Sequence, residues 1–223
     1  MLPRTLEPEV MSTAEEVQAY DTMDHSQVNQ KFIEDLLAAI EIQADSRILD
    51  LGTGTGLIPL EFVRQCAEGT ILGVDLSEQM IETARGHVLK YGLEDRIQFQ
   101  AADATATCFL PVSYDVLMSN SIVHHIPEPQ KFFVEATRLL RSGGQMFVRD
   151  LLRPDSVSEV ENLVQFHAAH DTDFQQQLLR QSLHAALTIS EVESMLEQIS
   201  DLQANVTQTS DRHWTLIGEK RSG

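Results

Sequence analysis

Five apolar stretches of strand length recur between residues 47 and 150 of this chain, and segments of helical period separate most of them. A parallel connection between two strands needs a dozen or more residues, which a helix supplies. This alternation therefore predicts an α/β fold built around a parallel sheet. The predicted strands are Arg47–Leu51, Thr70–Asp75, Ile97–Ala101, Tyr114–Ser119 and Gln145–Asp150.

Two of the connecting segments have clear helix boundaries. Ser77 is a good N-cap, and the apolar face that follows it ends at Gly92. Pro129 starts a second helix, which we expect to stop at the glycine pair 143–144. The stretch 103–113 is too short for a crossover helix, so we expect a loop there.

The C-terminal part differs, because a short turn alone separates its two strand-like stretches. "QANVTQT" and "HWTLIGEK" flank Ser210 and Asp211, which predicts an antiparallel hairpin. Helical periodicity marks the residues up to about Glu41 and the segment Leu151–Leu187, which could both cover the carboxyl ends of the strands, where open α/β sheets bind ligands. We expect one domain in four parts: an N-terminal helical cap (1–41), a ligand-binding core (42–150), an inserted helical lid (151–187), and a closing helix and hairpin (188–223).

The charge balance argues against a nucleic-acid partner. Lys and Arg number 16 against 34 Asp and Glu, which gives a formal net charge of −18. Nucleic-acid binders neutralise phosphates with clustered basic side chains, and no such cluster is visible. No apolar stretch approaches the ~18 residues of a membrane span, and the N-terminus does not resemble a signal peptide. We therefore expect no membrane partner and a cytoplasmic location, and we leave the oligomeric state open.

Three glycines occupy alternate positions where the first predicted strand meets a helix, in the stretch "DLGTGTG". An ordered glycine costs roughly 0.5–1 kcal/mol, so three together indicate an unusual backbone shape or a closely approaching ligand. A dinucleotide-binding loop follows the pattern GxGxxG, whose third glycine lets the helix approach the strand. Leu57 stands at that third position, so the fit to a nicotinamide dinucleotide is poor but not excluded.

"DLGTGTG" resembles the first motif of the class I S-adenosylmethionine-dependent methyltransferases, an acid followed by GxGxG. Four further features are similar to this family in order and spacing: Asp75 at the end of the second strand, "QAADAT", "YDVLMSNSIVHHIPEP" and "LLRSGGQMFV". The resemblance covers roughly Arg47 to Arg149 and the closing hairpin. It implies S-adenosyl-L-methionine as the cofactor. It also implies a Rossmann-like, mostly parallel seven-stranded sheet with an antiparallel C-terminal hairpin, helices on both faces and a helical lid.

The resemblance assigns roles to individual residues. Asp50 would bind the methionyl amino group through water, and Asp103 would accept from the adenine amino group. Asp75 would accept from both ribose hydroxyls, as a carboxylate at that place can in any Rossmann-like site. The expected cofactor-binding residues are Tyr20, Asp50, Gly52, Thr53, Gly54, Gly56, Asp75, Leu76, Met80, Ala102, Asp103, Ala104 and Asn120.

Methyl transfer from a sulfonium is a displacement on an already activated carbon, so alignment supplies most of the catalysis and only some acceptors need a base. His124 and His125 follow the fourth strand, near the expected position of the methyl group, and are the candidate catalytic residues. The alternative is that they only build the loop wall. We expect a small-molecule acceptor, and the sequence does not identify the accepting atom.

Three residues of the inserted segment, Phe166, His167 and His170, are candidates for contact with the acceptor. His167 and His170 are expected one turn apart on a helix, with His25 in the N-terminal segment. This spacing could seat a metal, but a polar helix face is favoured, and we expect no metal. Two other functions remain: a nicotinamide-dependent oxidoreductase, and a cofactor-binding regulator without turnover.

Overall fold

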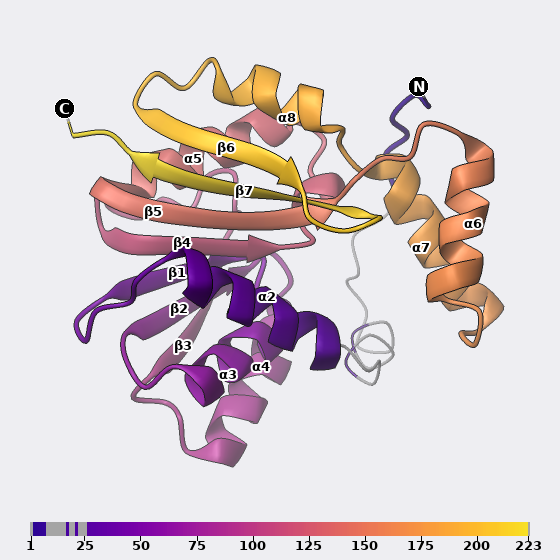
Figure 1. The fold of residues 1–223 in the computed structure, drawn as a ribbon. Coiled ribbons are helices and arrows are strands. Elements are labelled where there is room, and N and C mark those ends of the chain that lie inside the picture. The colour runs from indigo at the N-terminus through magenta and orange to yellow at the C-terminus, as the bar shows by residue number, and fades with distance from the viewer. Residues whose placement is uncertain (1, 8–16, 18–20, 22–25, 223) are drawn as a thin grey trace.

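The computed structural model describes residues 2–7, 17, 21 and 26–222, and these form one seven-stranded sheet in the order β3-β2-β1-β4-β5-β7-β6 (Figure 1). Strands β1 to β5 pair in parallel, and β7 lies antiparallel between β5 and β6. The predicted fold class is confirmed. The strands are β1 (Arg47–Leu51), β2 (Thr70–Asp75), β3 (Ile97–Ala101), β4 (Tyr114–Asn120), β5 (Leu140–Leu151), β6 (Leu202–Gln208) and β7 (His213–Lys220).

Helices cover both faces of the sheet (Figure 1). On one face lie α2 (Ser26–Ala39), α3 (Leu57–Gln65) and α4 (Glu78–Tyr91), and on the other lie α5 (Pro129–Leu139) and α8 (Ile189–Leu196). Neighbouring strand residues alternate between the two cores, because successive side chains of a strand point to opposite faces. Ile48 packs on the first face, for example, and Leu49 on the second.

Strand β5 begins at Leu140, five residues before the predicted start at Gln145, and α5 ends at Leu139 instead of at the glycine pair. Leu140 pairs with Tyr114, and the register then shifts along the two strands. The Lys220 Nζ in β7 donates to the Leu140 carbonyl oxygen at 3.0 Å, which ties this irregular stretch to the far end of the chain. The glycine pair is thus part of an irregular strand and not a helix stop.

The inserted segment after β5 forms two helices, α6 (Val157–His167) and α7 (Asp173–Ala185), which lie beyond the carboxyl ends of the parallel strands (Figure 1). They share a small apolar core, to which Val160, Val164 and Leu183 contribute. The prediction that His170 lies on the same helix as His167 is wrong. Helix α6 ends at His167. The chain leaves helical geometry at Ala168 and turns toward α7, so His170 lies in the connecting turn.

Among the described residues, no helix is long and apolar enough to cross a membrane.

Candidate functional site

The loop that joins β1 to α3 lies at the carboxyl edge of the sheet, where the strand order reverses between β1 and β4. Open α/β sheets bind ligands at such a reversal. Gly52 and Gly56 have φ angles of 76° and 78°, which side chains disfavour. A Cβ on Gly52 would lie 2.2 Å from the Ile122 side chain, and one on Gly56 would lie 2.6 Å from the Phe99 ring. Both glycines are therefore required by close packing as well as by backbone shape.

The backbone N–H groups of this loop are largely used within the protein. Those of Gly52 and Thr53 both donate to the Val74 carbonyl oxygen at 2.8 Å, and that of Gly54 donates to Asp75 Oδ2 at 2.9 Å. A loop that cradles a pyrophosphate must present free N–H groups to the anion. This loop instead places carboxylates beside its glycines, which disfavours an anionic ligand.

Asp50 lies near the end of β1 with 1% of its surface exposed, and its Oδ2 has no hydrogen-bond partner. Burial raises the pKa of this carboxyl from 3.8 to about 7, and the charge of Asp75 adds to the effect. A buried oxygen without a partner is costly and is satisfied by a donor from a ligand or water. The Asn120 Oδ1 at the end of the adjacent strand β4 is likewise buried without a partner. The edge formed by β1 and β4 can thus accept hydrogen bonds from a cationic or donor group.

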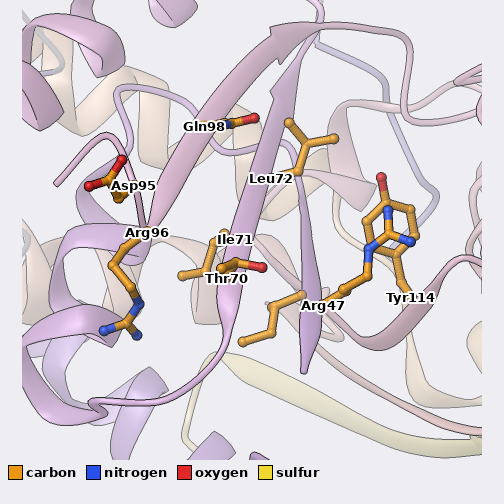
Figure 2. Close-up of a pocket in the computed structure, with 9 residues that line it drawn as sticks. Arg47, Thr70, Ile71, Leu72, Asp95, Arg96, Gln98 and Tyr114 are labelled. Carbon is orange, nitrogen blue, oxygen red and sulfur yellow. The ribbon is translucent and has the colours of Figure 1, made fainter. Parts of the chain in front are cut away.

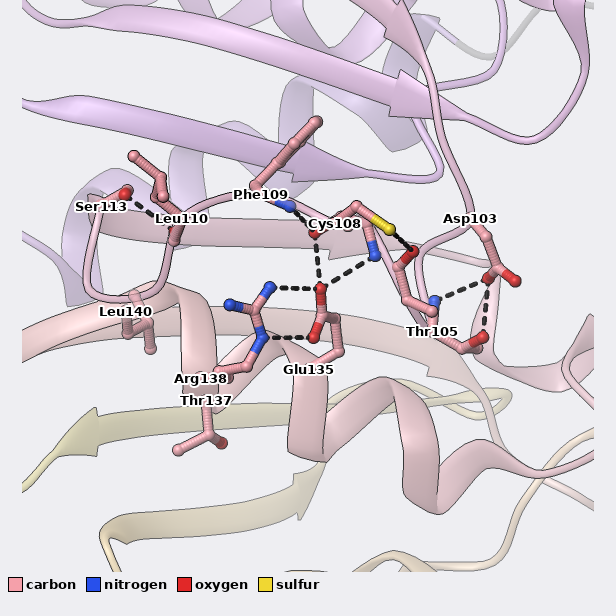
Figure 3. Close-up of polar contacts among 12 residues, drawn as sticks. Asp103, Thr105, Cys108, Phe109, Leu110, Ser113, Glu135, Thr137, Arg138 and Leu140 are labelled. Carbon is pink, nitrogen blue, oxygen red and sulfur yellow. Dashed lines mark hydrogen bonds and ion pairs between the residues drawn. The ribbon is translucent and has the colours of Figure 1, made fainter.

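Asp75 ends β2, and its two oxygens accept from the backbone N–H groups of Gly54 and Ser77, each at 2.9 Å. Its carboxylate therefore orients the glycine loop and the N-terminus of α4. Asp103 is exposed after β3, and its Oδ1 accepts from the N–H and the hydroxyl of Thr105 at 2.8 and 2.7 Å (Figure 3). The Ala102 N–H donates to the Asp75 carbonyl oxygen, so both acidic residues lie at one edge.

A charged network that the sequence reasoning missed anchors the loop carrying Asp103. Glu135 of α5 forms a two-bond ion pair with Arg138 and accepts from the Thr107 hydroxyl at 2.5 Å (Figure 3). Hydrogen bonds from Arg138 and Thr107 hold the pKa of the Glu135 carboxyl below its usual value, although its burial acts to raise it. The loop is therefore fixed to the helix on the second face of the sheet.

The remaining expected cofactor residues differ in exposure. Met80 is 7% exposed and packs in the interior, whereas Leu76 is 62% exposed at the carboxyl edge. Ala102 and Ala104 are partly buried on the loop after β3. Tyr20 lies outside the residues that the structure describes.

Two adjacent histidines, His124 and His125, lie in the 3-10 turn η1 (Val123–His125), which follows β4, and they differ in burial and in hydrogen-bond partner. His124 is buried, and its Nδ1 lies 2.5 Å from Asp150 Oδ1 in β5. Burial acts to lower the pKa of His124, but the charge and hydrogen bond of Asp150 outweigh it and raise that pKa. His125 is about one-third exposed, and its Nδ1 lies 2.7 Å from Glu7 Oε2. His124 is therefore buried and bonded to Asp150, and His125 lies at the surface of the site.

The N-terminal residues 2–7 lie across this turn, which sequence reasoning did not anticipate. The Arg4 side chain donates to the carbonyl oxygens of Ala185, His124 and Ile126 at 2.7, 3.0 and 3.0 Å. Burial acts to raise the pKa of Glu7, but the hydrogen bond and charge of His125 lower it overall. In the sequence, Asp150 ends the stretch "VRD" at the carboxyl edge of β5, and this position could have identified it as a site candidate. No feature of the sequence identifies Glu7 as one.

The three candidates in the inserted segment lie apart from this turn or face solvent. Phe166 is 78% exposed and contacts His167 edge-on, with ring centroids 4.9 Å apart. The His167 Nε2 lies 2.7 Å from Asp211 Oδ2 in the turn between β6 and β7. His170 is exposed. Their contact with an acceptor stays a prediction.

A pocket of about 270 Å³ lies at the opposite edge of the sheet, at the amino ends of the strands (Figure 2). Arg47, Thr70 and Tyr114, the first residues of β1, β2 and β4, contribute to its lining. The Arg47 guanidinium lies 5.3 Å from the centroid of the Tyr114 ring. None of the candidate site residues that the structure describes lines this pocket, so it is separate from the site.

Comparisons with known proteins agree with this geometry. A family model described as a methyltransferase domain matches residues 42–211. Methyltransferase GfsG of Streptomyces halstedii is 27% identical over 139 residues, which are 62% of this chain and 50% of that protein. A ubiquinone biosynthesis O-methyltransferase of Parvibaculum lavamentivorans is 33% identical over 109 residues, 49% of this chain and 42% of that protein. The chain thus spans about half the length of these curated relatives.

The fold is also similar to that of a solved structure. A SAM-dependent methyltransferase from Aquifex aeolicus superposes with a TM-score of 0.69 at 17% identity, covering 93% of this chain and 98% of that one. At this level of identity the likeness concerns the fold.

Proposed function

Because this chain belongs to the class I S-adenosylmethionine-dependent methyltransferases, we propose that it transfers the methyl group of S-adenosylmethionine to a small-molecule acceptor. S-adenosylmethionine, when bound, supplies a methyl group activated by its sulfonium. The residues of this chain would bind and align the two partners, and alignment accounts for much of the rate in such a displacement.

The unpartnered buried oxygen of Asp50, beside a loop whose N–H groups are mostly satisfied, carries the proposal. A ligand with an ammonium group and no phosphate fits this combination of charges. A nicotinamide dinucleotide, by contrast, would bring its pyrophosphate to a loop in which the N–H groups of Gly52, Thr53 and Gly54 already have acceptors. These contacts favour S-adenosylmethionine over the nicotinamide alternative.

We assign the expected cofactor contacts to the residues at this edge. Asp50 and Asn120 would face the methionyl end, Asp75 the ribose, and Asp103 the adenine. Hydrogen bonds from nearby loop residues orient the carboxylates of Asp75 and Asp103, which lowers the entropic cost of binding.

His125 is the better candidate for a proton acceptor of the two histidines. An imidazole must be neutral to accept a proton, and the bond to Asp150 raises the pKa of His124, which favours its protonated form. His124 would then act as a positioning residue that fixes η1. His125 is partly exposed and is oriented by Glu7, so its second nitrogen is available to an acceptor.

A small-molecule acceptor is supported by the name of a relative, a ubiquinone biosynthesis O-methyltransferase, and by the formal net charge of −18, which does not suit a nucleic-acid substrate. The accepting atom stays undetermined, because base assistance is needed for some acceptors and not for others.

Calorimetry tests the proposal. We expect S-adenosylhomocysteine to bind and NAD⁺ and NADH not to bind, and the reverse result would overturn it. Methyl release over a panel of hydroxyl, amine and thiol acceptors then separates an enzyme from a regulator that binds the cofactor without turnover.

A further inference from the structure

Three potential metal ligands meet where the N-terminal residues cross η1. Glu7, His124 and His125 each offer one ligand atom, and these atoms lie within 4.8 Å of one another. The three come from two separate parts of the chain, since Glu7 belongs to the N-terminal segment and both histidines belong to the turn after β4.

We propose that Glu7, His124 and His125 form a binding site for a divalent first-row transition cation of the Zn²⁺ or Fe²⁺ kind. Two imidazoles and one carboxylate suit such ions, whereas Mg²⁺ and Ca²⁺ prefer oxygen ligands alone. Three protein ligands leave at least one coordination position for water or for an oxygen of a bound molecule.

The surroundings of His124 support this proposal independently. Its Nδ1 is bonded to Asp150, and Asp150 in turn accepts from the N–H groups of Val123 and Leu151, both at 2.6 Å. Metal-binding histidines commonly bond their second nitrogen to a carboxylate, which fixes the ring and strengthens the ligand. Asp150 has this arrangement, and Nε2 is the nitrogen of His124 that this bond does not use.

The second support is the carboxylate of Glu7. Its Oε2 contacts His125 Nδ1 at 2.7 Å, while its Oε1 is buried without a partner. The nearby Arg4 fixes the N-terminal segment through three carbonyl oxygens, so this carboxylate is held over the two rings. A cation between Glu7 and the two rings would satisfy the unpartnered oxygen of Glu7. The charge of Glu7 and Asp150 would then be balanced by the metal.

The proposal does not require the methyl transfer proposed above. A cation on His125 would occupy a nitrogen that the metal-free protein could use for a proton. Metal binding and proton acceptance by His125 would therefore belong to two different states of the protein.

Titration of the untagged 223-residue chain with Co²⁺, in the absence of cofactor and acceptor, tests this site. We expect one equivalent to produce a saturable visible absorption band, because Co²⁺ in an imidazole and carboxylate site absorbs in the visible range, and we expect Zn²⁺ to abolish it. Glu7→Gln and His125→Gln should each weaken Co²⁺ binding at least tenfold. Neither side chain is in the main cores of the domain, so both variants should fold, which circular dichroism would check.

His167→Gln is the matched control. It removes an imidazole that also contacts a carboxylate at 2.7 Å, that of Asp211, but that has no third metal ligand beside it among the described residues. Its Co²⁺ affinity should equal that of the unmodified chain. The proposal is overturned if the unmodified chain gives no saturable band, or if Glu7→Gln and His125→Gln bind Co²⁺ as the control does. Binding of S-adenosylhomocysteine is measured separately, so either outcome leaves the test of methyl transfer intact.

Discussion

Replacing Asp50 by Asn should stabilise the protein in mildly alkaline solution while weakening its cofactor site. In the folded chain this carboxyl is buried with one unpartnered oxygen, and its pKa is raised to about 7 by burial and by the charge of Asp75. Asn has a similar shape and no charge. The substitution therefore removes the cost of burying an ionised group.

The magnitude follows from the pKa of Asp50 in the two states. The difference between 3.8 and about 7 corresponds to about 4 kcal/mol at about 1.36 kcal/mol per pH unit. Because the folded pKa lies above the unfolded one, the folded state binds more protons in this window, and its stability falls as the pH rises through it. This cost is about 2 kcal/mol at about pH 5.5 and reaches about 4 kcal/mol at about pH 8. The advantage of Asp50→Asn should thus increase by about 2 kcal/mol between these two pH values.

Urea unfolding at both pH values measures this difference. The chain has a single tryptophan, Trp214, which is fully buried in β7 and whose fluorescence reports unfolding. Because the free energy of unfolding of each protein is compared between the two pH values, any pH-independent effect of the new amide on stability cancels. Calorimetry at about pH 8 should show S-adenosylhomocysteine binding weakened by about 1.5–3 kcal/mol, the range for a hydrogen bond to a charged group.

Asp95→Asn is the control, because Asp95 is an exposed carboxylate on the loop before β3, at the opposite edge of the sheet (Figure 2). Its effect on stability should change little between the two pH values, and cofactor affinity should be unaffected. The reasoning is refuted if the stability difference of Asp50→Asn is the same at both pH values. An unchanged affinity for S-adenosylhomocysteine would remove Asp50 from the cofactor site.

Three further substitutions test the remaining roles. Asp75→Asn should weaken S-adenosylhomocysteine binding roughly tenfold to over a hundredfold, and an unchanged dissociation constant in calorimetry would exclude Asp75 from the site. His125→Gln should lower turnover by ~10²–10⁴ with cofactor affinity nearly intact, measured with an acceptor found in the methyl-release panel; full turnover would mean that His125 only builds the loop. Phe166→Ala should change KM for that acceptor while the cofactor dissociation constant moves less than about threefold, and α6 would be purely structural if both constants moved together or neither did.

The strands of the parallel core could be predicted from the sequence because each is a short apolar run bounded by polar or turn residues. The predicted bounds of β1, β2 and β3 agree with the structure. The start of β5 could not be predicted in this way. A glycine pair after a helix fits a helix stop, and only the pairing of Leu140 with Tyr114 and the contact from Lys220 make the stretch a strand. Those partners are distant in sequence, so local patterns do not contain them.

That the expected cofactor residues lie at one edge of the sheet could be predicted for a similar reason. Its motifs follow one another directly at the ends of successive strands, and the parallel sheet brings those ends together. The cluster on η1 could not be predicted, because Glu7 reaches His125 from the N-terminus and Asp150 reaches His124 from another strand. The structure thus shows the carboxylate partners of two histidines that the sequence had already identified as candidates.

The pairing of His124 with Asp150 also limits the pH range in which η1 is held most firmly. The raised pKa of His124 gives a stabilising contribution that is complete below its ordinary value of 6.5 and is lost as the pH rises through the folded value. The lowered pKa of Asp150 gives a contribution that is present above its ordinary value of 3.8 and is lost as the pH falls through the folded value. The turn is therefore held best where both groups are charged. His125, the proposed proton acceptor, is on the same turn, so its position depends on both of these charges. The pH dependence of turnover should then have two limbs, with the alkaline limb set by loss of the His124 proton.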